Sequence, residues 1–501
     1  MESLPTEVWF SITEHFTHDE VQALIGVNRF FFNLGMDARY EDITIETSGK
    51  QVHLYLEHVM QNHVAKRIKH LTVQLQPVLP VRPIRALHSA PQPPSKREQF
   101  KKGFKTIVRK VLPERSPSPS FLPKPIETNE ALVQKLIDVI TCMKNVVDFR
   151  IVTWAFPEAN YDLQPLHNAA WNTFGVNLKR VSLCANMEGH KSLIASNPRF
   201  KKLETLELEF SDTMNPFPVN NTSPASSDAA QIMTGAVVPF VNKLSPQIKT
   251  FKIRSWASLD LSNLFLGVDQ FPVLEAILFR IPFNFALRSN PSGLTTFLHA
   301  SSKTLKKVAL RLTPVGLALD PLREEPLCQW MTETVSNSLC FSNAETLDIC
   351  PTHLPGGMSI LHSCVEHSTE HLSRFVLRDR YLTYEDVVPF VKTLRGARYL
   401  TSLRLNVFTL NAPMFDAFAR DLPTLQLLWL SVGDADSSAG SHQLSSLRED
   451  MKTRKYDTWN LWDLSIWQGG SELDGQTMLA IASSIPSLGS FWENGHKRID
   501  C

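Results

Sequence analysis

Two cysteines and two histidines have a spacing that could bind a metal ion. Cys350-x-x-His353 is followed ten residues later by Cys364-x-x-His367. Two thiolates and two imidazoles can complete the tetrahedral shell of a zinc ion, and a metal-dependent enzyme would need that site. The alternative is that Cys350 ends a strand and Cys364 lies in a helix, where a thiol is an ordinary packing residue. We favour the alternative and predict no metal site and no cofactor.

Other catalytic chemistry has no motif in this sequence. A Walker loop, a GxGxxG turn after a strand, a GxSxG elbow, an HExxH helix and the kinase signatures are all absent. We therefore predict that the chain is not an enzyme and has no catalytic residues. Lys plus Arg number 51 and Asp plus Glu 50, which gives a formal net charge of +1. Such a chain has no overall field that favours nucleic acid or a charged membrane, and we expect neither as a partner.

Basic residues recur at alternate positions of the segments predicted to be strands. Side chains of a strand alternate between two faces, so the apolar positions point to the core and the intervening ones to the open face. That face begins with Glu207 and Glu209, becomes basic apart from Asp348, and ends in tryptophans. Lys307 and Arg374 belong to its basic part. The residues predicted to bind a target are Lys252, Arg254, Arg280, Arg311, Arg378, Arg404, Trp429 and Trp467.

This pattern predicts a surface that recognises a protein. Arginine binds carboxylates and phosphates in a bidentate way, and an exposed tryptophan supplies binding energy through its apolar area. The predicted ligand is an acidic or phosphorylated segment of a target protein. The alternative is that these basic residues only keep the sheet soluble, or pair with acids of neighbouring repeats.

A repeated unit, apolar-x-x-apolar-x-apolar followed by a helical stretch, must position these residues. Its clearest copies begin at Leu203, Ile248, Leu305, Leu372 and Leu400. A short strand and one amphipathic helix cannot bury their apolar faces alone, so successive units must stack. The pattern resembles an irregular leucine-rich repeat, which implies an α/β fold with a curved solenoid of strand-helix units. The competing interpretation is a generic α/β fold with several parallel strands.

The helices predicted between the strands cover residues 129–143, 291–301, 385–394 and 474–484, where apolar residues recur at intervals of three and four. Residues 433–447, rich in Ser, Gly and Asp, are predicted to form a loop. The units therefore alternate strand, helix and loop along most of the chain.

Residues before position 46 predict three short helices that pack on one another. Pro5 suits the first position of a helix, and apolar residues then recur at helical spacing. Three helices of this size bury little apolar surface, and this segment is rich in aromatic residues. We therefore expect it to have a docking partner. The alternative is a helical cap that shields the end of the following domain.

The same residues resemble the F-box motif, from Leu4-Pro5-x-Glu7-Val8-Trp9 to Val27-Asn28-Arg29-x-Phe31. In that family the three helices bind a Skp-type adaptor, which connects the protein to a cullin-RING ubiquitin ligase. The common tryptophan of the third helix is replaced here by Phe31 or Phe32. The adaptor-binding residues that the resemblance implies are Leu4, Pro5, Glu7, Val8, Ile12, Phe16, Val21, Leu24, Val27 and Phe31.

The domain organisation follows from these patterns. The chain has 501 residues, of which 43% are apolar, which is too many for one ordinary core. We predict an F-box-like helical domain over 1–45, a connecting helix and first strand over 46–76, and a leucine-rich-repeat-like solenoid over 129–495. Prolines and basic residues between them predict a disordered insertion over 77–128.

The function implied by the resemblance is that of a non-catalytic substrate-recognition subunit of a Skp-cullin-F-box type ubiquitin ligase. The helices would bind the adaptor and the solenoid a target protein, whose identity the sequence does not give. The alternative is a leucine-rich-repeat scaffold that binds an adaptor without ubiquitination. Seven cysteines without a close CxxC pair fit reduced thiols, and the first residues lack the pattern of a secretory signal. We therefore expect a cytoplasmic or nuclear protein.

Overall fold

The computed structural model describes most of the chain outside the predicted insertion. The described residues are 6–13, 15–16, 18–47, 52–76, 128–153, 162–196, 198–211, 227–255, 259–283, 285–313, 321–336, 339–433, 437–468 and 471–491. The insertion predicted over 77–128, except residue 128, lies outside them, as do Leu4 and Pro5. The chain forms two compact units, Met1–Val146 with Ala155–Phe174 (unit 1), and Val147–Trp154 with Gly175–Cys501 (unit 2).

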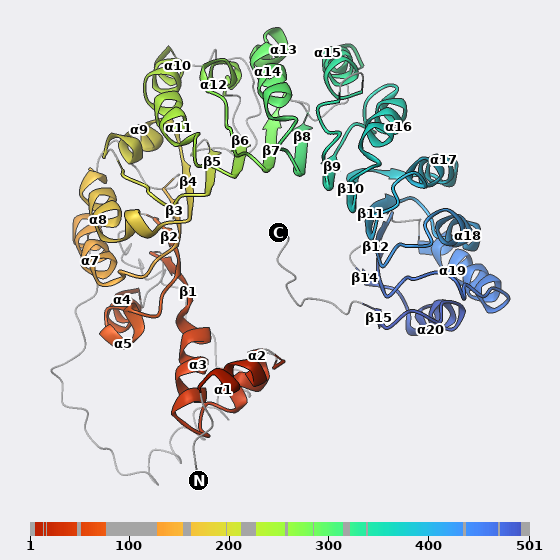
Figure 1. Ribbon diagram of the computed structural model, residues 1–501, viewed down its shortest axis with the longest axis horizontal. Coiled ribbons are helices and arrows are strands. Elements are labelled where there is room, and N and C mark those ends of the chain that lie inside the picture. The colour runs from red at the N-terminus through yellow and green to blue at the C-terminus, as the bar shows by residue number, and fades with distance from the viewer. Residues whose placement is uncertain are drawn as a thin grey trace, which may run out of the picture. The chain divides into compact units, whose positions relative to one another are not determined.

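Unit 1 consists of short helices and two parallel strands (Figure 1). Strand β1 (Asp42–Glu46) precedes the strand that we predicted as the first, β2 (His70–Gln74). It has the same spacing as the repeat, because Tyr40, Ile43 and Ile45 are all buried. The helices are α1 (Thr6–Thr13), α2 (His18–Ala23), α3 (Arg29–Tyr40), α4 (Val52–Val59), α5 (Asn62–Ala65), α7 (Asn129–Cys142) and α8 (Gln164–Phe174).

Unit 2 is built on one long sheet whose strands follow the order of the sequence. Each strand from β3 to β13 pairs in parallel with the next one along the chain. This order is that of a stacked repeat, whereas a doubly wound sheet reverses its strand order. The strands are β3 (Asp148–Val152), β4 (Arg180–Ala185), β5 (Thr205–Phe210), β6 (Thr250–Ser255), β7 (Ala276–Pro282), β8 (Lys307–Thr313), β9 (Thr346–Ile349), β10 (Arg374–Leu382), β11 (Ser402–Val407), β12 (Leu427–Val432) and β13 (Asp463–Gln468).

The connecting helices of unit 2 lie on one side of this sheet, and its strands line the inner side of the array (Figure 1). We call the face without helices the open face. The connecting segments are η2 (Gly175–Asn177), α9 (Met187–Ala195), α10 (Ser227–Ile232), the π-helical η3 (Met233–Val237), α11 (Val238–Leu244), α12 (Ser262–Gly267), α13 (Phe285–Ser289), α14 (Ser292–Ser301), α15 (Pro321–Met331), the π-helical η4 (Thr332–Ser336), α16 (Gly357–Ser368), α17 (Tyr384–Leu394), α18 (Ala412–Asp421), α19 (Ser437–Lys452) and α20 (Gly475–Ser484). Parallel sheet, sequential strand order and one-sided helices together confirm the predicted α/β class and resemble a leucine-rich-repeat solenoid.

The apolar positions of the repeat form the core between sheet and helices. In the copy that begins at Leu203, the residues Leu203, Leu206 and Leu208 are each 0% exposed. The copies that begin at Ile248, Leu305, Leu372 and Leu400 are equally buried. Burial of every second strand residue on this side turns the intervening residues toward the open face.

Several helices of unit 2 begin at capping residues, which explains where these strand-helix units turn. The Thr383 hydroxyl accepts a hydrogen bond from the Asp386 amide, and the Asp386 carboxylate accepts one from the Thr383 amide. Asn411 and Asp474 cap α18 and α20 in a similar way. Such caps satisfy amides that have no partner within the helix, so the turn is set by local sequence.

The C-terminal end of unit 2 differs from the prediction. The loop predicted over 433–447 is wrong from Ser437 onward, because α19 begins there. Leu447 and Met451 of this helix are buried, and burial of that apolar face outweighs the weak helix propensity of Ser and Gly. Strand β13 then pairs with the short strands β14 (Ser471–Glu472), antiparallel, and β15 (Ser490–Phe491), parallel.

Candidate functional site

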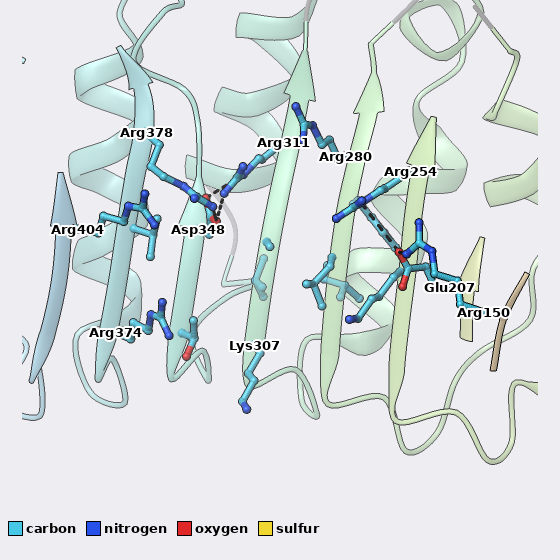
Figure 2. A pocket seen from close by; sticks show the side chains of 18 residues that line it. Arg150, Glu207, Arg254, Arg280, Lys307, Arg311, Asp348, Arg374, Arg378 and Arg404 are labelled. Atoms are coloured by element: carbon cyan, nitrogen blue, oxygen red, sulfur yellow. Dashed lines mark hydrogen bonds and ion pairs between the residues drawn. The ribbon is translucent and has the colours of Figure 1, made fainter. Parts of the chain in front are cut away.

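A groove of about 470 Å³ lies on the open face of unit 2 (Figure 2). It is lined by nine basic and two acidic side chains, all from strands between β3 and β11. Apolar residues, among them the half-buried Leu278 and Ala309, also line it. The charged lining residues are Arg150, Glu207, Lys252, Arg254, Arg280, Lys307, Arg311, Asp348, Arg374, Arg378 and Arg404.

The register of the sheet orders these side chains in rows. Arg254, Arg280 and Arg311 stand side by side on β6, β7 and β8. Two residues earlier on the same strands are Lys252, Leu278 and Ala309, followed by Asp348 on β9. A further row contains Lys307 and Arg374. Both lie at the amino ends of their strands, away from the arrowheads in Figure 2.

Asp348 links two of the groove's arginines. Its carboxylate accepts hydrogen bonds from Nε and Nη2 of Arg311, at 3.2 and 2.5 Å, and from Nη2 of Arg378 at 3.1 Å. Burial raises the pKa of Asp348, and the hydrogen bond from Arg311 opposes part of that rise. The alternative that acids of neighbouring repeats pair with these basic residues thus holds for Arg311 and Arg378.

A second acidic group lies at the β5 end of the groove. Glu209 accepts a hydrogen bond from Arg150 at 2.9 Å, and Glu207 lies 3.8 Å from the same guanidinium. Arg254 approaches Glu207 only to 4.0 Å. Arg150 was not among the predicted residues, although it occupies an outward position of the apolar-x-apolar alternation in β3. These pairs leave the groove with a large excess of positive charge.

The electrostatics at the centre of the groove reflect that excess. Burial, followed by repulsion from Arg311 and Arg254, lowers the pKa of Arg280. Burial also lowers the pKa of Lys252, which Glu207 partly opposes. Like charges held close together in a half-buried site favour a bound anion, because the anion relieves their repulsion and replaces lost hydration.

The two predicted tryptophans lie beyond the groove's lining and differ from each other. The guanidinium carbon of Arg404 lies 3.9 Å from the ring centroid of Trp429, so one face of that half-buried ring is already covered. Trp467 is 41% exposed. All six predicted basic residues line the groove, whereas neither predicted tryptophan is among its lining residues.

Exposed aromatic residues at the carboxyl ends of two neighbouring strands were not singled out by the sequence analysis. Tyr381 is 46% exposed and Phe408 is 52% exposed. They lie at the carboxyl ends of β10 and β11, and a Cβ atom on Gly433 would lie 3.4 Å from the Tyr381 ring and 3.5 Å from the Phe408 carbonyl oxygen. The alternation of apolar and outward positions could not identify them, because Tyr381 lies where the register of β10 shifts and Phe408 follows the last residue of β11.

The Cys and His pairs do not assemble into a metal site. Among the described residues, no group of three or more His, Cys, Asp or Glu side chains is placed to hold a metal ion. Burial raises the pKa of the Cys350 and Cys364 thiols. His353 lies beside Asp379, with 3.4 Å between Nδ1 and Oδ2. The zinc alternative therefore has no support from the geometry.

The residues predicted to bind an adaptor divide into buried and exposed groups. Val21 and Phe31 are buried, and the Phe31 ring meets the Trp9 ring edge-on with 5.3 Å between centroids. Asn28 caps α3 by accepting a hydrogen bond from the Phe31 amide at 3.0 Å. Phe16 and Leu24 are half-buried, and Glu7 lies in α1.

The exposed group is apolar. Val8 is 40%, Ile12 36% and Val27 63% exposed, and Phe32 adds a further exposed ring at 46%. These four side chains place exposed apolar area on helices α1 to α3 and the turn between α2 and α3. Leu4 and Pro5, the first two residues of this predicted surface, lie outside the described residues.

Comparisons with known proteins leave the family open. A scan against protein-family models and a search of curated proteins both find no match. Within the part of the chain that the structure describes, every helix is too short or too polar to cross a bilayer.

Proposed function

We propose that this chain is a recognition subunit that binds an acidic segment of a target protein in its groove. In this proposal helices α1 to α3 bind a Skp-type adaptor, which would connect the bound target to a cullin-RING ubiquitin ligase. The observation that carries the proposal is the groove, where nine basic side chains from six strands between β3 and β11 line one half-buried surface.

The groove supports recognition of an anionic protein segment through its size and charge. Its volume of about 470 Å³ is that of a site that holds a few side chains. Arginine in such a site forms bidentate bonds with carboxylates or phosphates, and these are stronger than bonds between neutral groups. The excess of positive charge also favours the approach of an acidic partner.

The adaptor half of the proposal rests on the N-terminal helices. Their order and spacing resemble an F-box, and the exposed side chains of Val8, Ile12 and Val27 supply apolar area for docking. Buried Phe31 and Val21 would then hold the helices together. Since the sequence has no catalytic motif, the contribution of the chain would be proximity, which brings a target to a conjugating enzyme.

Binding to a purified Skp-type adaptor tests this half. Val27→Asp places a charge on the exposed apolar surface and should lower adaptor binding at least tenfold, while the thermal unfolding of the protein stays the same. The matched control is Val176→Asp, at a valine of η2 that is 44% exposed. If neither the wild-type protein nor the variants bind the adaptor, the F-box interpretation is wrong.

A ubiquitination assay separates the proposal from its alternative. The alternative is a scaffold that binds an adaptor without transfer of ubiquitin. Reconstitution of the chain with adaptor, cullin, RING protein and conjugating enzyme should ubiquitinate a protein captured by the groove. Adaptor binding without transfer to the captured protein would favour the scaffold.

A further inference from the structure

Three arginines form a row across the centre of the groove. Arg254, Arg280 and Arg311 hold matching register positions on the adjacent strands β6, β7 and β8. Neighbouring strands lie about 4.8 Å apart, so the three side chains begin at evenly spaced points. Figure 2 shows all three toward the carboxyl ends of their strands. Such a row presents several N–H donors to one anion.

A small apolar floor lies next to this row. Leu278 and Ala309, two residues earlier on β7 and β8, are register partners, line the groove and are half-buried. The distance along a strand between the two rows is about 6.5 Å. The short side chain of Ala309 leaves the floor hollow there. Lys252 borders this floor on one side and Asp348 on the other.

This arrangement combines an anion site with a small apolar surface about one ring length away. Resting on the proposed function, we infer that this part of the groove binds a phosphotyrosine side chain of the target segment. The phosphoryl group lies among Arg254, Arg280 and Arg311, and the phenyl ring lies on Leu278 and Ala309.

The charges select a phosphoryl group over a carboxylate. Asp348 already accepts hydrogen bonds from Nε and Nη2 of Arg311. One arginine satisfies a carboxylate in a bidentate pair, so Arg254 and Arg280 together with Nη1 of Arg311 still exceed what a single Asp or Glu side chain can use. A phosphoryl group has three acceptor oxygens and a charge near −2. It also relieves more of the repulsion from Arg311 and Arg254 that, after burial, lowers the pKa of Arg280. Asp348, at the end of the apolar row, repels the phosphoryl group and orients it toward the arginines.

The apolar floor selects tyrosine over serine or threonine. In phosphotyrosine the ring separates the backbone from the phosphoryl group by a distance comparable to that between the two rows. Phosphoserine has no apolar surface to place on Leu278 and Ala309, and its short stem would draw the peptide backbone down between the basic side chains. Burial of the ring against the floor therefore adds affinity that phosphoserine lacks.

Three fluorescent peptides measure this selectivity on the full chain. Each has nine residues of Gly, Ser and Glu around a central phosphotyrosine, phosphoserine or glutamate. Fluorescence anisotropy should give a Kd about tenfold lower for the phosphotyrosine peptide than for the phosphoserine peptide, and a weaker affinity still for glutamate. Phenyl phosphate should displace the bound peptide at a lower concentration than inorganic phosphate does.

Two variants separate the ring from the phosphoryl group. Ala309→Leu fills the hollow and should remove the tenfold preference for phosphotyrosine while phosphoserine binding stays the same; Ala480→Leu, at a half-buried alanine of α20, is its control. Arg280→Gln should weaken both phosphopeptides about tenfold, whereas Arg398→Gln, at an exposed arginine outside the groove, should not.

The outcomes distinguish this inference from the proposed function. Equal affinity for phosphotyrosine and phosphoserine, or a preference that survives Ala309→Leu, would overturn the inference and leave an acidic ligand intact. Failure of all three peptides to bind would overturn the role of the groove itself.

Discussion

Helices α1 to α3 and the groove expose surfaces of opposite kinds. The helices present apolar side chains such as Val27, which is 63% exposed. The groove presents arginines that are themselves held by acids, as Asp348 holds Arg311 and Arg378. An apolar surface binds through burial of area, and a charged groove through paired charges that must lose water. The comparison predicts that the two surfaces respond differently to charge, salt and pH.

Charge reversal in the groove should have the largest effect. Arg280→Glu removes the central cation and places a carboxylate between Arg254 and Arg311. Affinity for an acidic or phosphorylated peptide should fall by about 4 kcal/mol, roughly a thousandfold, because attraction becomes repulsion. Adaptor binding should remain as in the wild-type protein. Titration calorimetry measures both, and an equal loss of adaptor binding would show that the variant is misfolded.

Unit 2 should lose stability in mild acid. His190 is fully buried, its ring lies 4.6 Å from that of Phe210, and burial lowers its pKa from 6.5 to about 4. Between pH 4 and pH 6.5, His190 is therefore protonated in the unfolded chain and neutral in the folded chain. The stabilising contribution is complete above pH 6.5 and is lost as the pH falls to 4, by roughly 3 kcal/mol.

Denaturant unfolding of the full chain at pH 4 to 7 measures this loss. His190→Gln removes the titrating group, so the variant should lose less stability over that pH range. The account would be contradicted if the variant and the wild-type protein lost the same free energy of unfolding between pH 7 and pH 4.

Asp348→Asn should separate stability from binding within the groove. The change removes the charge that holds Arg311 and Arg378, and the free energy of unfolding should fall by about 1 to 2 kcal/mol. The groove then carries more positive charge, so affinity for the phosphorylated peptides should rise. If peptide affinity fell as well, Asp348 would matter more for positioning Arg311 and Arg378 than for repelling the ligand.

Salt should distinguish the two surfaces directly. Between about 0.05 and 0.5 M NaCl, peptide binding by the groove should weaken about tenfold, since added ions screen exposed charges. Adaptor binding should change little over the same range because it depends on apolar area. Parallel salt dependence of the two equilibria would remove the distinction between the surfaces.

The smallest effect is expected at the edge of the groove. Trp429→Ala removes the ring that Arg404 covers at 3.9 Å. A partly exposed cation-π contact contributes about 0.5 to 1 kcal/mol. Without the ring the Arg404 side chain is held less firmly, so peptide affinity should fall less than fivefold. A loss as large as that of Arg280→Glu would instead make Trp429 a direct anchor for the target.

The sequence predicted the repeat and the face on which the basic residues lie, because both follow from local alternation. In the triplet Leu203, Leu206 and Leu208, the same spacing that defines the motif also defines which side chains are buried. The outward position of Arg280 then follows without knowledge of any long-range contact. Helix α17 was likewise predictable from the apolar positions of residues 385–394 and lies at Tyr384–Leu394.

The partners of these residues could not be predicted in the same way. The contact of Asp348 with Arg311 and Arg378 depends on which strands are neighbours and on how long side chains bend across them. The cover of Trp429 by Arg404 has the same origin. Helix α19 was missed because its apolar residues are sparse and its stability comes from packing.

The central claim is that the groove binds an acidic segment of a protein. Its most direct test is selection of peptides from a tyrosine-phosphorylated random library on the immobilised full chain, with the Arg280→Glu variant as the control. The account predicts that acidic and phosphorylated sequences are enriched on the wild-type protein and that this enrichment disappears on the variant. Equal enrichment on both proteins, or selection of sequences without negative charge, would contradict it.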